Sequence, residues 1–141
     1  MSYILKSITL VFCLASLSVV AARSPAPKDA KAFIISPKDG AKVKSPVTIQ
    51  FGLEGMGVAP AGMKMDKTGH HHLLINVDKM PRMNLPLPAT DKIVHFGGGQ
   101  TQVTKELKPG QYTLQILLGD HSHIPHEPPV LSEKITVEVV E

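Results

Sequence analysis

Residues 107–118 read Leu-Lys-Pro-Gly-Gln-Tyr-Thr-Leu-Gln-Ile-Leu-Leu, and this stretch decides the fold class. Its second part, residues 112–118, is a nearly continuous apolar run that lies between a Pro-Gly turn and Gly119. A run of this length and composition predicts a buried β-strand. The fold is therefore expected to be built around a β-sheet.

A leucine, a Pro-Gly turn and a tyrosine lead into this strand. The same order of residues forms the tyrosine corner of immunoglobulin-like sandwiches, in which the phenol hydroxyl bonds to backbone a few residues upstream. An ordinary hairpin with a tyrosine in the core is the alternative. We favour the corner because all three residues occur together where a long strand opens.

Short strands separated by turn residues are predicted along the rest of the domain. Alternating or β-branched apolar residues mark them, and no window has a convincing helical period. Residues 55–68 and 79–91 are predicted loops, because the first is rich in glycine and the second in proline. The further strands are expected at residues 33–35, 47–53, 70–77, 93–96, 103–107 and 135–139. The pattern predicts an all-β, immunoglobulin-like antiparallel β-sandwich of one domain.

The N-terminal residues have the composition of a secretory signal peptide. Lys6 precedes the apolar run 8–15, and small residues follow at positions 20–22, where cleavage would occur. The stretch is too short and too early for a permanent transmembrane helix. We expect a cleaved signal peptide over residues 1–22, a flexible linker over 23–31, and the sandwich domain over 32–141. The mature protein is then periplasmic or secreted, without membrane insertion.

Loss of the leader limits the chemistry of the mature chain. The only cysteine, Cys13, is lost with it, so any metal must be held by imidazole, thioether or carboxylate groups. Phe12 stands where a lipoprotein acceptor cysteine needs a small residue, which disfavours a lipid anchor. Without Lys6, 14 basic residues face 12 acidic ones, a net charge of +2. A charge this small and scattered indicates no nucleic-acid surface.

Six of the seven histidines lie in two short segments. Residues 119–126 read Gly-Asp-His-Ser-His-Ile-Pro-His directly after the buried strand, and residues 69–72 read Gly-His-His-His. In extended backbone, residues two apart project from the same face, about 7 Å apart at Cα. His121 then pairs with His123, and His70 pairs with His72.

The triplet at residues 70–72 also predicts which of its histidines is structural. If Leu73, Ile75 and Val77 face the core, His71 shares their side, so it is expected to be structural, while His70 and His72 face away. We expect the two segments to meet and hold one ion. The predicted ligands are His70, His72, His121, His123 and His126.

The available ligand types and the predicted export limit which metal the site could hold. Imidazoles suit Cu(II), Zn(II) and Ni(II), and thioethers favour Cu(I). Met63 and Met65 stand in the loop before the triplet, which favours copper first and zinc second, although methionine also fills gaps under loops. Asp120 either orients an imidazole or caps the turn after Gly119. Possible further ligands or supporting residues are His71, His95, Asp120, Met63 and Met65.

Three kinds of function stay open. The first is an exported protein that binds a transition metal for storage, delivery or sensing. The second is a non-metal ligand-binding or structural interaction module whose histidines form a polar rim. The third is a small copper oxidoreductase of the superoxide-dismutase type. An enzyme is disfavoured because the sequence has no Gly-x-Ser-x-Gly elbow, His-Glu-x-x-His motif or phosphate loop.

Several motifs resemble those of a known family. They cover residues 55–62 (Gly-Met-Gly-Val-Ala-Pro-Ala-Gly), 69–75, 95–101 (His-Phe-Gly-Gly-Gly-Gln-Thr), 117–126 and 132–136. From about Phe33 onward the chain resembles a family of short exported bacterial domains catalogued as domain of unknown function 4399. The resemblance implies export, a bacterial source and an immunoglobulin-like architecture, but no activity.

The resemblance also bears on single residues. Met63 and Met65 stand where family members carry polar residues, so it does not strengthen the methionine argument for copper. The family pattern is matched at His70, His71, His72, His95, Asp120, His121, His123 and His126.

Overall fold

The computed structural model describes residues 23–141, which form nine β-strands and no helix. The expected signal peptide lies outside these residues. Within the described part, no helix is long and apolar enough to cross a membrane. The strands are β1 (Lys31–Ser36), β2 (Lys42–Lys44), β3 (Val47–Glu54), β4 (Gly57–Val58), β5 (Thr68–Ile75), β6 (Ile93–His95), β7 (Gln102–Lys105), β8 (Gly110–Gly119) and β9 (Ile135–Val140).

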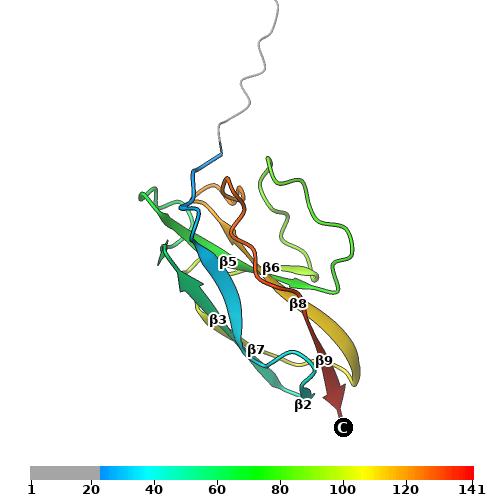
Figure 1. Ribbon diagram of the computed structural model, residues 1–141. Helices are drawn as coiled ribbons and strands as arrows, with labels where there is room; N and C mark the ends of the chain where they lie inside the picture. Colours follow the sequence, from blue (N-terminus) through cyan, green and yellow to red (C-terminus); the bar gives the residue numbers. More distant parts are fainter. Residues whose placement is uncertain (1–22) are drawn as a thin grey trace, which may run out of the picture.

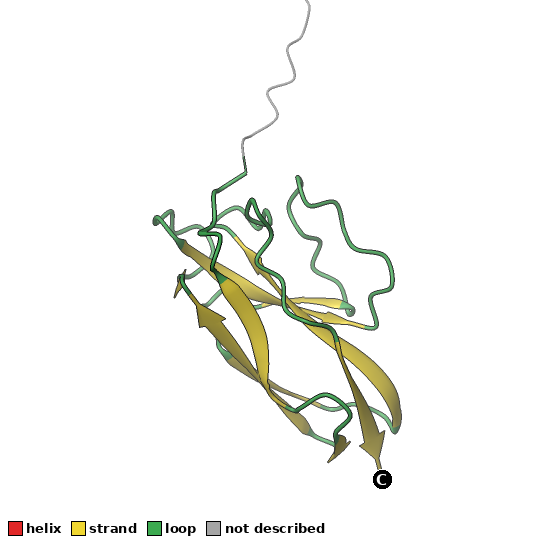
Figure 2. Cartoon of the chain, viewed as in Figure 1, coloured by secondary structure: helices red, strands yellow, loops and turns green. Residues whose placement is uncertain are grey.

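The strands form two sheets that pack face to face (Figures 1 and 2). The smaller sheet has the order β1-β3-β7 and is antiparallel. The larger sheet has the order β2-β9-β8-β5-β4, and β6 also pairs with β5. Two short pairings, β2 with β9 and β4 with β5, are parallel. The prediction of an all-β sandwich is confirmed, while the finer immunoglobulin-like assignment stays a prediction.

The main core lies between the sheets. It is built from alternate residues of facing strands, among them Ile49 and Phe51 of β3, Leu73 of β5, and Leu114 and Ile116 of β8. Period-two alternation sends these side chains inward. Leu73 and Ile75 face this core, as the alternation predicts, whereas Val77 packs in a second cluster instead.

The larger sheet also buries part of its outer face. Leu74 of β5 and Leu117 of β8 point away from the main core and pack with Val77, Leu87 and Ile93. Residues 76–92 form a long excursion that contributes Val77 and Leu87 to this second cluster (Figure 1). Burial on both faces explains the continuous apolar runs at residues 73–75 of β5 and 116–118 of β8. The outer face matters here because it also carries the candidate site.

The predicted tyrosine corner is present. The hydroxyl of Tyr112 donates a hydrogen bond to the backbone carbonyl of Lys108, 3.0 Å away. This bond spans the Pro-Gly turn and fixes where β8 starts. The elements that the sequence did not predict are β2 and β4, which have three and two residues. Strands this short show no measurable periodicity.

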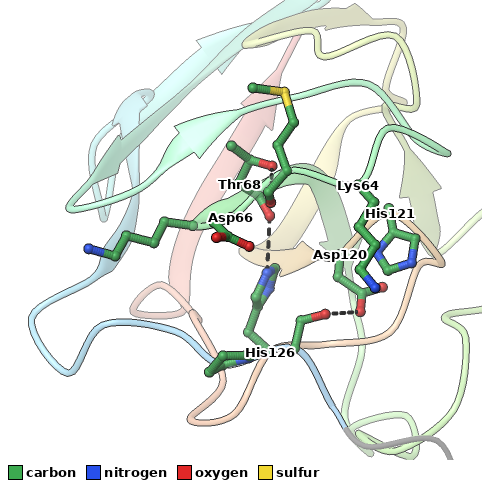
Figure 3. Close-up of a pocket in the computed structure, with 10 residues that line it drawn as sticks. Lys64, Asp66, Thr68, Asp120, His121 and His126 are labelled. Carbon is green, nitrogen blue, oxygen red and sulfur yellow. Dashed lines mark hydrogen bonds between the residues drawn. The ribbon is translucent and has the colours of Figure 1, made fainter.

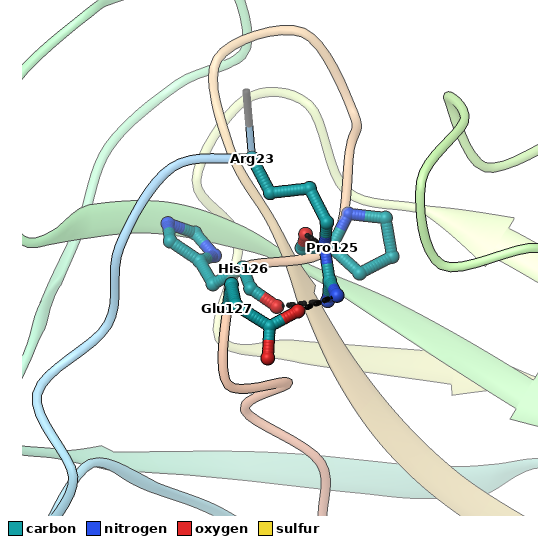
Figure 4. A network of polar contacts seen from close by, with 4 residues as sticks. All are labelled: Arg23, Pro125, His126 and Glu127. Atoms are coloured by element: carbon teal, nitrogen blue, oxygen red, sulfur yellow. Dashed lines mark hydrogen bonds and ion pairs between the residues drawn. The ribbon is translucent and has the colours of Figure 1, made fainter. Parts of the chain in front are cut away.

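The segment before β1 lies against the histidine loop that follows β8. Arg23 donates from Nε to the carbonyl of Pro125 (3.0 Å), from a terminal nitrogen to the carbonyl of His126, and forms an ion pair with Glu127 (Figure 4). Backbone bonds from Glu127 to Ser24 (2.9 Å) and from Ala26 to Glu127 (3.0 Å) continue the contact. The domain boundaries predicted from sequence stay predictions, and these contacts join the segment to the loop.

Candidate metal centre

Four histidines meet on the outer face of the larger sheet. Each offers a ring nitrogen, and these nitrogens all lie within 4.8 Å of one another. His70 and His72 come from β5, His95 from β6 and His123 from the loop after β8. We call these four residues the histidine cluster.

Strand register brings three of the four together. His70 and His72 project from one face of β5, two residues apart, as the alternation predicts. The antiparallel pairing of β5 with β6 sets His95 directly opposite His72. His70 is opposite Gly119 of β8, so the chain leaves the sheet beside this imidazole. The turn that follows β8 then brings His123 to the other three histidines.

His123 is held in an uncommon backbone conformation. Its φ is 65°, in the left-handed region, which is unfavourable for most side chains by about 1–2 kcal/mol. Two hydrogen bonds fix it there: its N–H donates to the carbonyl of Asp120 (2.9 Å), and its carbonyl accepts from the N–H of Leu87 (2.9 Å). Strained residues of this kind concentrate at functional sites. The loop therefore holds the imidazole of His123 at the cluster.

Two glycines provide the space that the rings occupy. A Cβ atom at Gly119 would lie 2.7 Å from Cε1 of His72, and one at Gly97 would lie 2.4 Å from Cε1 of His95. Both distances are shorter than carbon atoms tolerate without displacement. The imidazoles therefore pack directly on glycine backbone at both positions.

Several ring nitrogens of the cluster lack protein partners. Nδ1 of His70, both ring nitrogens of His72 and Nε2 of His95 are buried and make no hydrogen bond to any described residue. Each unpaired buried polar group costs about 1–3 kcal/mol. Nε2 of His70 and Nδ1 of His123 are 3.1 Å apart, so this pair shares a hydrogen bond. An ion at the centre would satisfy several unpaired lone pairs at once.

Burial disfavours the charged form of three of these imidazoles. Together with the charges of neighbouring histidines, it lowers the pKa of His70 to about 4 and that of His72 to about 3. Burial, followed by the charge of His123, also lowers the pKa of His95. Neutral imidazole is the form that binds metal. His70, His72 and His95 are therefore ready to coordinate at neutral pH without losing a proton first.

His71 lies on the opposite face of β5, as the alternation predicts. It is fully buried and packs on Phe51 in the main core, with the ring centroids 5.3 Å apart. Burial lowers its pKa. This histidine lies outside the cluster.

The structure does not bring His121 and His126 to the cluster. Nε2 of His126 donates to the carbonyl of Thr68 (3.1 Å), and burial lowers its pKa. His121 and His126 line a separate cavity of about 340 Å³, together with Asp120, Ser24 and residues 64–68 (Figure 3). The expected pairing of His121 with His123 assumed extended backbone. The chain instead turns after Gly119, so the two side chains diverge.

Asp120 organises this turn. Its Oδ1 accepts the N–H groups of Ser122 (2.8 Å) and Ile124 (3.0 Å), and its Oδ2 accepts the hydroxyl of Ser24 (2.6 Å). Of the two roles considered, these bonds match the turn cap. Burial alone would raise the pKa of Asp120, but the three hydrogen bonds outweigh it and lower the pKa. The carboxylate thus shapes the loop that presents His123.

The methionines lie farther from the site than expected, whereas His95 belongs to it. Met63 and Met65 have exposed fractions of 50% and 56%, and neither belongs to the cluster. His95, expected only as a further ligand, is one of the four. The signal that could have found it is its place on a short strand, but nothing in the sequence fixes the register of β6 against β5.

The fold and the cluster define an all-β sandwich with a site that could hold a metal ion on the outer face of one sheet. The chain belongs to the family described as domain of unknown function (DUF4399), whose model matches residues 49–140. No curated protein and no solved structure matches the chain significantly. The match covers all four cluster histidines.

Proposed function

We propose that this protein binds one transition-metal ion through His70, His72, His95 and His123, for storage, delivery or sensing outside the cytoplasm. The observation that carries the proposal is the convergence of four histidine ring nitrogens within 4.8 Å, several of them without a protein partner. Natural structures rarely leave buried polar groups unpaired. Metal coordination is the simplest chemistry that satisfies all four rings.

Copper and zinc both suit imidazole ligands. The sequence favoured copper partly through Met63 and Met65, but these side chains are exposed and outside the cluster. Without the methionines the imidazoles do not rank copper above zinc, so both ions are proposed here. The composition of residues 1–22 supports export.

The experiment is a metal titration of the untagged protein expressed from its full sequence and exported by the host. After chelator treatment, calorimetry with Cu(II) and Zn(II), and with Cu(I) under anaerobic conditions, should show saturable binding of one ion per chain. Mass spectrometry of the same sample tests cleavage after Ala22. Absence of one-to-one binding for all three ions would refute the proposal.

A second candidate, a module that binds a non-metal ligand, is favoured by the cavity of about 340 Å³ beside the cluster. It is lined by His121, Asp120, Lys64 and Asp66, so groups of both charges face it (Figure 3). A small polar ligand would suit such a lining. A fragment screen by NMR that shifts signals of His121 but not of His72 would favour this function.

A further inference from the structure

The distances between the four imidazole rings report how the rings surround their common centre. Each ring can be treated as a point at its centroid, and four points have six separations. These are 4.5 Å for His95–His123, 4.8 Å for His70–His72, 4.9 Å for His70–His95, 5.0 Å for His70–His123, 5.2 Å for His72–His95 and 6.1 Å for His72–His123.

Coordination geometry makes definite demands on these separations. A metal–nitrogen bond of about 2.0–2.1 Å sets each centroid about 3.2 Å from the ion. Rings at the corners of a tetrahedron are then all about 5.2 Å apart. Rings in a plane instead give four separations of about 4.5 Å and two diagonals of about 6.4 Å, and the two diagonals share no ring.

The observed separations do not match the planar arrangement. If His72 and His123, 6.1 Å apart, formed one diagonal, His70 and His95 would have to form the other. That pair is only 4.9 Å apart. Five of the six separations lie between 4.5 and 5.2 Å, so the rings approximate a tetrahedron with one edge lengthened.

We infer that the histidine cluster is a closed, near-tetrahedral site for zinc(II). The inference rests on the proposed function and specifies which ion the site holds. Tetrahedral sites suit zinc, whereas Cu(II) and Ni(II) prefer tetragonal or square-planar surroundings. Cu(I) prefers sulfur ligands, and the four donors here are all nitrogen.

Four protein ligands also limit what the ion can do. Structural zinc sites are closed by four protein ligands, while catalytic ones keep a position for water or substrate. A closed site should hold or hand over its ion without turning over superoxide. His70 and His72 are fully buried, whereas His95 and His123 are partly exposed. His123 is the one ligand of the four that stands on a loop. It is therefore the ligand expected to move aside when an ion enters or leaves.

Cobalt(II) is the probe that tests this geometry, because four-coordinate tetrahedral Co(II) absorbs visible light strongly and six-coordinate Co(II) only weakly. The untagged protein should bind one Co(II) with intense visible bands, which one equivalent of Zn(II) should remove. The Cu(II) form should give an electron paramagnetic resonance spectrum with a reduced parallel hyperfine splitting, as tetrahedral distortion produces. Neither the Co(II) form nor the Cu(II) form of the protein should accelerate superoxide decay.

Variants of the loop histidines supply the controls. His123→Asn should weaken the cobalt bands as water enters the coordination sphere, and asparagine accommodates the left-handed backbone at this position. His121→Asn, in the same loop but outside the cluster, should leave the spectrum unchanged. Stoichiometric Co(II) binding with a faint six-coordinate spectrum, or a tetragonal Cu(II) spectrum, would overturn the inference and leave metal binding intact. Failure to bind any of the three ions would overturn both.

Discussion

Two groups of histidines lie side by side at one end of the sandwich, and they differ in how their polar atoms are satisfied. Nε2 of His126 donates to a backbone carbonyl, although its Nδ1 has no partner among the described residues, and the neighbouring Asp120 accepts three hydrogen bonds. In the cluster, by contrast, His72 has no partner for either ring nitrogen among the described residues. Unpaired ring nitrogens also occur at His71 and at Nδ1 of His126, so they do not by themselves mark a site. The comparison teaches that the convergence of four imidazoles on one centre is what indicates a ligand.

The largest effect should come from removing a cluster ligand. His72→Ala should weaken metal binding by more than about 100-fold, because it deletes a ligand where even supporting residues are worth 10–100-fold. The matched change His121→Ala should alter affinity by less than about 3-fold. Competition titrations against a chromophoric chelator measure both. Equal losses in the two variants would erase the distinction between the two groups.

Acid should destabilise the metal-free protein through the cluster. The pKa values of His70 and His72 in the fold, about 4 and about 3, lie below the ordinary 6.5, so the unfolded chain binds more protons between these values. Their contribution is fully present above pH 6.5 and is lost as pH falls toward 4 and below. Each histidine adds a slope of up to about 1.4 kcal/mol per pH unit.

Urea unfolding of the metal-free protein at a series of pH values measures this slope. His72→Leu should show a shallower dependence between pH 6.5 and 4 than the parent protein, because one of the two groups no longer titrates. An unchanged slope in this variant would assign the acid sensitivity to other groups.

A methyl group at Gly119 should disturb the cluster without removing a ligand. Gly119→Ala places carbon 2.7 Å from the ring of His72, and such overpacking costs about 1–3 kcal/mol. We expect weaker metal binding together with lower stability, measured on the same samples. Gly57→Ala is the control, since its added carbon meets Thr68 at an ordinary 3.4 Å. If both variants behave alike, the packing of His72 on glycine is unimportant.

The variant with the smallest effect on metal affinity should still lower the stability of the fold. His126→Ala removes a buried imidazole and leaves the Thr68 carbonyl without its donor, which should lower the unfolding free energy by about 1–3 kcal/mol. Affinity for the ion should stay within about 3-fold of the parent. Denaturant unfolding and metal titration together check this. A loss of affinity like that of His72→Ala would place His126 among the ligands after all.

Regular strands were predictable because alternation fixes side-chain direction. His71 points into the core and its two neighbours point out, as the pattern of Leu73 and Ile75 requires. The loop histidines were not predictable in this way, because the bonds of Asp120 turn the chain at Gly119 and set the φ of His123. The place of His95 depends on pairing between strands distant in sequence, which periodicity cannot supply.

The contact between Arg23 and the histidine loop has a consequence for where the folding unit begins. The region that matches the family model starts at Ile49, inside β3, and so omits β1 as well as the arginine that bonds to Pro125, His126 and Glu127. A fragment cut to the matched region would expose the edge of β3 where β1 pairs and would remove the contacts of Arg23 with residues 125–127 of the histidine loop. We expect such a fragment to be less stable than residues 23–141, because the N-terminal segment fastens the end of the loop that carries His123.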